Sequence, residues 1–191
     1  MLALFLVSTA VRAILTAYDH ERFPEALLVK VELLPLIFPV HMVTGGLALL
    51  LVPLTFLLRG TRYHKWAGRF TVADVLVAGI TAIPVALTAP VAPLAAAGFA
   101  TQGVVWLALI SKGVWHIRRR EIQKHRNTML MMAAVTSGAM FFRIYLALWA
   151  IYGSPAWFEA FYACDSWIAW VFPLALSALI ISMRERRRVL G

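Results

Sequence analysis

Residues 34–58 read LPLIFPVHMVTGGLALLLVPLTFLL, an apolar run without Asp, Glu, Lys or Arg. A helix of this length crosses the apolar core of a bilayer, which is about 30 Å thick, with some tilt. Comparable apolar stretches occupy 67–89, 94–116, 128–152 and 161–183, and a shorter one occupies 1–18. We therefore expect an all-α integral membrane bundle of six transmembrane helices, which forms a single transmembrane domain over residues 1–191.

The composition excludes most soluble classes of protein. The chain has 191 residues, of which 62% are hydrophobic and 14% are charged, and its mean hydropathy is +0.80. Soluble domains are about 45–50% apolar and about 25% charged. The only cysteine, Cys164, excludes an internal disulfide and any paired-cysteine motif. The sequence also lacks HExxH, GxSxG and Walker-type glycine loops, which favours a non-catalytic protein over an enzyme.

The first apolar stretch, 1–18, has features of both a signal peptide and a retained span. It lacks a basic N-terminal region, carries Arg12 in its middle and ends in Leu15-Thr16-Ala17, which is a poor cleavage site. We expect it to be retained as the first span. In the loop that follows, 19–33, the apolar stretch 26–29 between charges is compatible with a short helix at the membrane interface or with a polar connector.

The positive charges indicate how the chain is oriented. The predicted topology places 14 of the 18 basic residues on one side, namely Arg59, Arg62, Lys65, Arg69, Lys112, Arg118, Arg119, Arg120, Lys124, Arg126, Arg184, Arg186, Arg187 and Arg188. The opposite loops carry Asp19, Glu21, Glu25, Glu32 and Glu159. By the positive-inside rule both termini are cytoplasmic. We expect a multi-pass membrane protein, in which the net charge of +9 sets the topology and the partner is the lipid bilayer, with no nucleic acid.

Three charged residues lie inside the predicted spans, Arg12, Asp74 and Arg143, and two more polar residues, His41 and Asp165, lie at the outer edge. Charges inside a membrane usually face the interior of a bundle. Helical spacing places Arg143 on a small or polar stripe with Met132, Thr136, Ala139 and Ala147, opposite Phe142, Leu146 and Trp149. The side chains in the outer half are compatible with one ligand pocket there, which is formed by Arg12, His41, Arg143 and Asp165. The alternative is an Arg143–Asp165 ion pair that only locks two helices together.

His64 and His125 form a second candidate site, because both precede a span on the basic side and lie at matching depth. Two imidazoles at one level on facing helices are able to hold a b-type haem. A quinone site beside an aromatic wall is an alternative, and so are interfacial histidines without a ligand. We expect no metal-ion site, since no ligand spacing is present. The neighbours with suitable chemistry are Arg62, Arg69 and Arg126 for haem propionates, and Trp66 and Trp115 for a quinone.

Three short motifs carry a family resemblance: residues 41–46 (HMVTGG), residues 63–69 (YHKWAGR), and Lys124-His125-Arg126 followed by Met129 and Phe142-Arg143. They resemble an uncharacterised family of six-span bacterial membrane proteins, domain of unknown function 2306, over roughly 38–185. The resemblance implies a fold and a place in the bacterial inner membrane, and no activity.

The chain is also similar, more distantly, to the six-span dihaem cytochromes b that oxidise ascorbate and reduce ferric iron. A second haem of that kind would need a histidine opposite His41 in the fourth span, where Gln102 stands instead. At most one haem is therefore expected, between His64 and His125.

Small size and short loops favour a non-catalytic accessory or structural subunit of a larger respiratory or photosynthetic membrane complex. The alternative is a membrane redox protein that binds one b-type haem or a quinone. A second alternative is a small transporter that uses the pocket of Arg12, His41, Arg143 and Asp165, although the sequence lacks the repeats and broken helices typical of transporters.

Overall fold

The computed structural model describes residues 2–17 and 25–190, and these residues form helices and no strand. Five of the helices are long and apolar enough to cross a membrane. They are α3 (Ile37–Leu57), α4 (His64–Leu87), α5 (Pro93–Arg118), α6 (Ile122–Tyr152) and α7 (Phe158–Leu190). Their positions confirm the all-α fold and five of the apolar spans expected from the sequence.

The remaining helices are shorter. α1 (Leu2–Thr16) has 15 residues, which corresponds to about 22 Å, less than the thickness of a bilayer core. α2 (Glu25–Leu33) is the short helix considered for the loop before the second span, and a single 3₁₀ turn, η2 (Pro155–Trp157), precedes α7. Asp19 and Glu21 lie outside the described residues.

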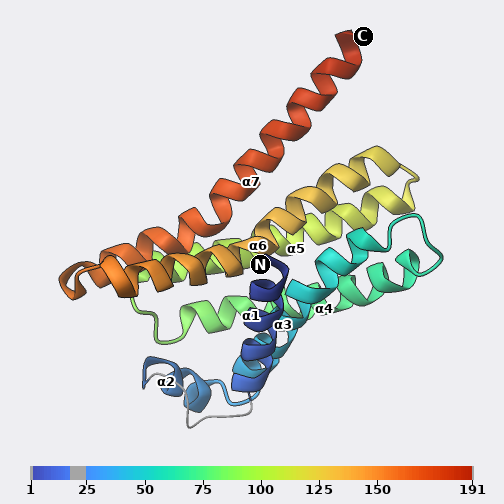
Figure 1. Cartoon of the computed structure of the whole chain (residues 1–191). Coiled ribbons are helices and arrows are strands. Elements are labelled where there is room, and N and C mark those ends of the chain that lie inside the picture. The colour runs from blue at the N-terminus through green and yellow to red at the C-terminus, as the bar shows by residue number, and fades with distance from the viewer. Residues whose placement is uncertain (1, 18–24, 191) are drawn as a thin grey trace.

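The helices from α3 to α6 form an up-and-down bundle (Figure 1). Each packs against the next along the chain, and α3 also contacts α6, which closes the ring. α1 packs on α3, while α7 packs on α6 and α5. The turns after α3 and α5 lie at the same end of the bundle, which we call the basic end because it carries the basic residues of 59–69 and 112–126. The connections 88–92 and 153–157 lie at the opposite end.

A buried cluster of side chains fills the space between the long helices. The polar atoms inside it are paired: the indole N–H of Trp106 donates a hydrogen bond of 2.9 Å to the Thr136 hydroxyl, which itself donates to the carbonyl of Met132. The pairing removes the cost of leaving a buried donor unsatisfied. The cluster comprises Ala48, Val52, Val75, Ala78, Trp106, Ile110, Met132, Val135 and Trp170.

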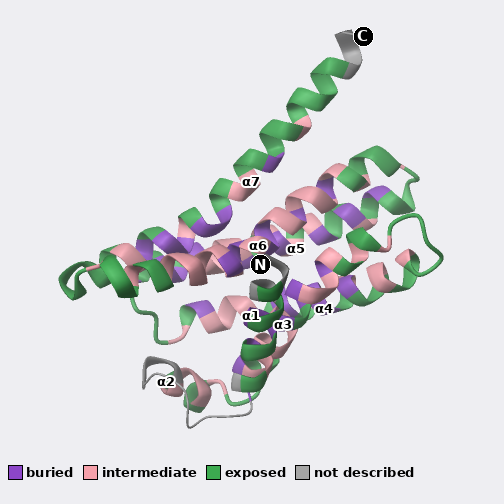
Figure 2. Ribbon diagram, in the orientation of Figure 1, coloured by how far each residue is buried: buried purple, intermediate pink, exposed green. Residues whose placement is uncertain are grey.

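Much of the outward side of the long helices is exposed (Figure 2), and many of the exposed side chains are large and apolar. In the most apolar 18 residues of each long helix, only 22–28% of the residues are buried inside the bundle. Large aliphatic side chains such as Leu57 and Ile151 are exposed by 81% and 69%. Soluble monomers rarely expose contiguous apolar surface on this scale, whereas a bilayer is a favourable surrounding for it. The protein is therefore a multi-pass membrane protein whose outer surface contacts lipid.

Two adjacent glycines of α3 have different surroundings. A Cβ atom at Gly46 would lie 2.9 Å from the backbone oxygen of Ala10 and 3.0 Å from a side-chain carbon of Ile14, whereas a Cβ atom at Gly45 would meet nothing within 4 Å. Small residues of this kind allow helix backbones to approach closely in membranes. Gly46 therefore allows α1 to lie close to α3.

A tight turn of three residues, Arg119–Glu121, joins α5 to α6. The Glu121 N–H donates to the carbonyl of His116 at 3.0 Å, and the Arg120 N–H donates to the carbonyl of Ile117 at 3.1 Å. These two bonds form a Schellman motif, which satisfies the last carbonyls of α5. Arg120 takes the left-handed position with φ of 60°, where a glycine is usual.

Lys30 ties α2 to the end of α4. Its ammonium group donates a hydrogen bond of 2.8 Å to the carbonyl of Val85 and a second one to the carbonyl of Thr88. A cation is favourable at a helix C-terminus, where the carbonyl groups point outward. Burial lowers the pKa of the Lys30 ammonium.

Candidate functional site

His64 is the first residue of α4 and lies at the basic end of the bundle. Its ring atom Nδ1 is 3.0 Å from the carbonyl oxygen of Thr55, near the end of α3. The hydroxyl groups of Thr55 and Thr71 are joined by a second hydrogen bond of 2.8 Å between the same two helices. The start of α4 and the imidazole of His64 are thus held against α3 by polar contacts.

His125 occupies the corresponding position at the start of α6. Its Nδ1 atom is 2.8 Å from the carbonyl oxygen of Gly113 in α5. His41, near the start of α3, makes the same kind of contact, with 3.1 Å between its Nδ1 atom and the carbonyl oxygen of Ala78 in α4. A carbonyl oxygen only accepts, so in each contact Nδ1 carries the proton and donates it. Each of the three rings therefore presents Nε2 as its basic nitrogen.

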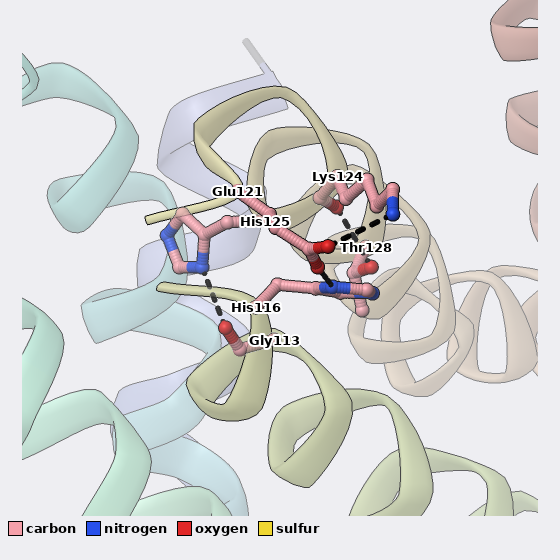
Figure 3. Close-up of polar contacts among 6 residues, drawn as sticks. All are labelled: Gly113, His116, Glu121, Lys124, His125 and Thr128. Atoms are coloured by element: carbon pink, nitrogen blue, oxygen red, sulfur yellow. Dashed lines mark hydrogen bonds and ion pairs between the residues drawn. The ribbon is translucent and has the colours of Figure 1, made fainter. Parts of the chain in front are cut away.

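His116 belongs to a different group, shown in Figure 3. Its Nδ1 atom lies 2.6 Å from the Glu121 carboxylate, which also accepts a hydrogen bond of 2.9 Å from Lys124. Hydrogen bonds from Lys124 and His116 hold the pKa of the Glu121 carboxyl below its usual range. In Figure 3 the ring of His125 points away from this group and bonds to Gly113 instead. The hydrogen bond to Glu121 thus holds His116 at the α5–α6 turn, whereas His125 makes no such bond with this group.

Among the four polar residues considered as a pocket, Arg143 and Asp165 do not form the ion pair that was considered as the alternative. Arg143 donates a hydrogen bond of 2.7 Å to the carbonyl of Ala139 in its own helix. Asp165 is buried, with 3% of its surface exposed, and neither of its carboxylate oxygens has a hydrogen-bond partner. The Arg143–Asp165 ion pair considered from the sequence is therefore not formed. Arg12 lies on the exposed side of α1.

Tyr162 lies among these groups and was missed by sequence reasoning. Tyr162 precedes Asp165 by three residues in α7, which is about one helical turn. The Tyr162 ring packs edge-on against Phe142 and Phe99, with ring centroids 5.3 and 5.9 Å apart. Phe142 thus faces an aromatic cluster inside the bundle, whereas the helical stripe had placed it opposite the interior. α6 contacts α3, α5 and α7, so more than one of its faces is interior.

A second buried acidic group lies in α4. Asp74 is 9% exposed, and its Oδ2 atom has no hydrogen-bond partner. The sequence marks this residue as a charge within a span. Whether this oxygen has a hydrogen-bond partner is decided by the side chains of neighbouring helices, and the sequence alone does not show where these lie.

The comparisons with known proteins give one family match. The model of the family described as predicted membrane protein, DUF2306, matches residues 38–181. Neither the curated proteins nor the solved structures yielded a match to the chain. The matched segment begins at the second residue of α3 and ends within α7. It therefore includes α4, α5 and α6 in full, nearly all of α3 and most of α7. The match covers well over half of the chain, so this protein belongs to the DUF2306 family of membrane proteins.

Proposed function

We propose that the protein is a membrane redox protein that holds one b-type haem at its basic end, with His64 and His125 as the axial ligands. One observation carries the proposal: Nδ1 of each ring donates to a backbone carbonyl, that of Thr55 for His64 and that of Gly113 for His125. This arrangement leaves Nε2 as the ligand atom. Histidines that bind metals usually make such a contact, which fixes the tautomer and the ring orientation and raises the basicity of the other nitrogen.

The residues around the two histidines fit the charge of a haem. Arg62, Arg69 and Arg126 are exposed at the same end and supply cations for the two propionates. When bound, a haem supplies an iron that is able to accept and release one electron. The protein's own contribution is to hold the two imidazoles through α3 and α5 and to place positive charge beside the carboxylates.

One haem is proposed rather than two. At the opposite end His41 also donates through Nδ1, but a second imidazole is absent from the described residues around it. Gln102 in α5, the residue at the place of the missing histidine, donates its amide to the carbonyl of Val135 at 3.2 Å. That side chain therefore links α5 to α6.

The test is the absorption spectrum of the purified protein, produced in cells supplied with a haem precursor, before and after reduction with dithionite. We expect a Soret band and a reduced α-band. His64→Ala and His125→Ala should each abolish the spectrum or change it to that of a high-spin haem, because each residue supplies one axial bond. His116→Ala is the matched control, since this buried histidine is bound to Glu121, and its spectrum should equal that of the wild type.

A colourless wild-type protein, or two variants with unchanged spectra, would overturn the proposal. A colourless preparation that copurifies with other membrane subunits would favour the accessory-subunit interpretation instead. A colourless preparation that copurifies with a quinone would favour a quinone site.

We also propose that α1 is a sixth span and that both termini lie in the cytoplasm of a bacterial cell, with the protein in the inner membrane. α1 exposes an apolar stripe at helical spacing, formed by Leu4, Val7, Val11 and Leu15, which supports contact with lipid. The basic end is the side that the positive-inside rule places in the cytoplasm. A reporter fused after Gly191 should be active in the cytoplasm, and one inserted at Pro90 should be active outside; the reverse pair of results would refute the orientation.

A further inference from the structure

Two exposed tryptophans lie at the same depth on neighbouring helices of the basic end, Trp66 in α4 and Trp115 in α5. α4 and α5 run antiparallel and contact each other at Gly79 and Gly103. Trp66 precedes Gly79 by 13 residues and Trp115 follows Gly103 by 12, so both lie about 18–20 Å along the helices from that contact. Aromatic residues that share one level on the outside of a bundle are typical of a membrane interface.

An arginine lies over each of these two rings. The guanidinium carbon of Arg119 is 4.0 Å from the centroid of the Trp115 ring, and that of Arg69 is 5.0 Å from the centroid of the Trp66 ring. Both distances are within the range of a cation–π interaction, and both arginines are exposed. A stacked guanidinium keeps the N–H groups at its edge for other partners, and its planar fork matches the oxygen atoms of a phosphate.

The positive charge at this end has few counter-ions. The stretches 59–69 and 112–126 carry ten Lys or Arg residues and one acidic residue, Glu121. The Glu121 carboxylate already accepts from Lys124 and contacts His116. Among the residues that the structure describes, neither Arg69 nor Arg119 forms an ion pair with a carboxylate. Both guanidinium groups are therefore available to an anion from outside the chain.

The depth of Trp115 indicates which anion meets Arg119. α5 has 26 residues and is about 39 Å long, whereas the apolar core of a bilayer measures about 30 Å. Trp115 lies three residues before the end of α5, and Arg119 follows that end directly, so both belong to the headgroup region. Phospholipids surround an outward-facing side chain at this depth, and their phosphate groups lie at the level of the arginine.

We propose that the face of α5 formed by Lys112, Trp115 and Arg119 binds the headgroup of an anionic phospholipid in the leaflet at the basic end. These three exposed residues follow the spacing of one helix face. Arg119 donates to the phosphate, and the Trp115 ring holds the guanidinium in place. An anionic lipid binds more tightly than a zwitterionic one, because it has no cation of its own to be repelled by the surrounding basic residues. The proposal uses no residue of the proposed haem site, so the two are tested separately.

The experiment titrates phosphatidylglycerol into the purified full chain in detergent and measures the dissociation constant of the first bound lipid by native mass spectrometry. Phosphatidylcholine with the same acyl chains is the comparison, and the wild type should bind it more weakly. Arg119→Gln should weaken the binding of phosphatidylglycerol at least tenfold, because a hydrogen bond between two charged groups is lost. Trp115→Leu should weaken it as well, since the guanidinium loses the ring on which it is stacked.

Arg118→Gln is the matched control. It removes the same charge from the adjacent exposed residue, which lies over no aromatic ring within the described part of the chain. This variant should lose no more than about fivefold, the diffuse effect of one basic residue near an anionic surface. Equal losses in Arg118→Gln and Arg119→Gln would overturn the proposal, because they would indicate diffuse attraction alone. Equal binding of the two lipids by the wild type would also overturn it. Displacement of the lipid by inorganic phosphate, but not by chloride at the same ionic strength, would do so in favour of a site for free anions.

Discussion

Gly45 and Gly46 offer a matched test of the contact between α1 and α3. They are adjacent in one helix, so replacement by alanine gives both positions the same gain in helix propensity, about 1 kcal/mol. They differ in packing, because only the Cβ atom at position 46 meets the backbone oxygen of Ala10, at 2.9 Å. A backbone atom cannot move aside as the end of a side chain does. In Gly46→Ala, α1 must therefore shift away from α3.

The difference between the two variants isolates the packing cost. Overpacking of this kind costs about 1–3 kcal/mol, and the propensity gain cancels in the comparison. Gly46→Ala should accordingly unfold with a free energy about 1–3 kcal/mol lower than that of Gly45→Ala. For a chain of this size about 2–4 °C of unfolding temperature corresponds to 1 kcal/mol, so the two midpoints should differ by about 2–12 °C.

The assay is thermal unfolding of the two purified variants and the wild type in one detergent, followed by tryptophan fluorescence. Gly45→Ala should be as stable as the wild type or slightly more stable. Equal midpoints for the two variants would refute the reasoning, because they would mean that α1 does not rest on residue 46. A lower midpoint for Gly45→Ala would mean that α3 turns its other side towards α1.

Three further changes have defined outcomes. Thr136→Val removes the acceptor of the buried Trp106 N–H, and the unpaired donor should lower the free energy of unfolding by about 1–3 kcal/mol in denaturant titrations. Lys30→Met removes the donors to the last carbonyls of α4, and hydrogen exchange at this helix end should become faster than in the wild type while exchange at the basic end stays the same. The pKa of Glu121 is lowered in the folded state by its hydrogen bonds, so its stabilising contribution is present above the ordinary glutamate pKa and is lost as the pH falls through the lowered value. The fall of the unfolding temperature with acidification should therefore be smaller in Glu121→Gln, and an identical fall in the two proteins would contradict this.

The length and the apolar composition of each stretch were sufficient to predict the five long helices. A run such as 34–58 has one stable form in lipid, because a helix satisfies every backbone group within the segment. It was also predictable that His64 and His125 lie at the same end of the bundle, because successive spans alternate in direction and both residues stand at the start of spans that run the same way. Their contacts with Thr55 and Gly113 were not, because they depend on how closely neighbouring helices approach.

The Arg143–Asp165 pair illustrates what spacing leaves undetermined. The sequence prediction placed both residues in the outer half of the bundle from their positions along their helices. Rotation of each helix about its axis decides whether two side chains meet, and a helix packed on several sides, as α6 is, has no single polar stripe. Arg143 thus bonds to the carbonyl of Ala139, and Asp165 is buried without a hydrogen-bond partner.

The turn between α5 and α6 sets two requirements of membrane proteins against each other. Arg120 holds the left-handed position of the Schellman motif, which costs about 1–2 kcal/mol for a residue other than glycine. A glycine would relax the backbone, yet it would remove one of three consecutive arginines, whose positive charges favour the cytoplasmic side in the orientation proposed above. Arg120 therefore lowers the stability of the folded turn, while its charge favours correct insertion of the chain into the membrane.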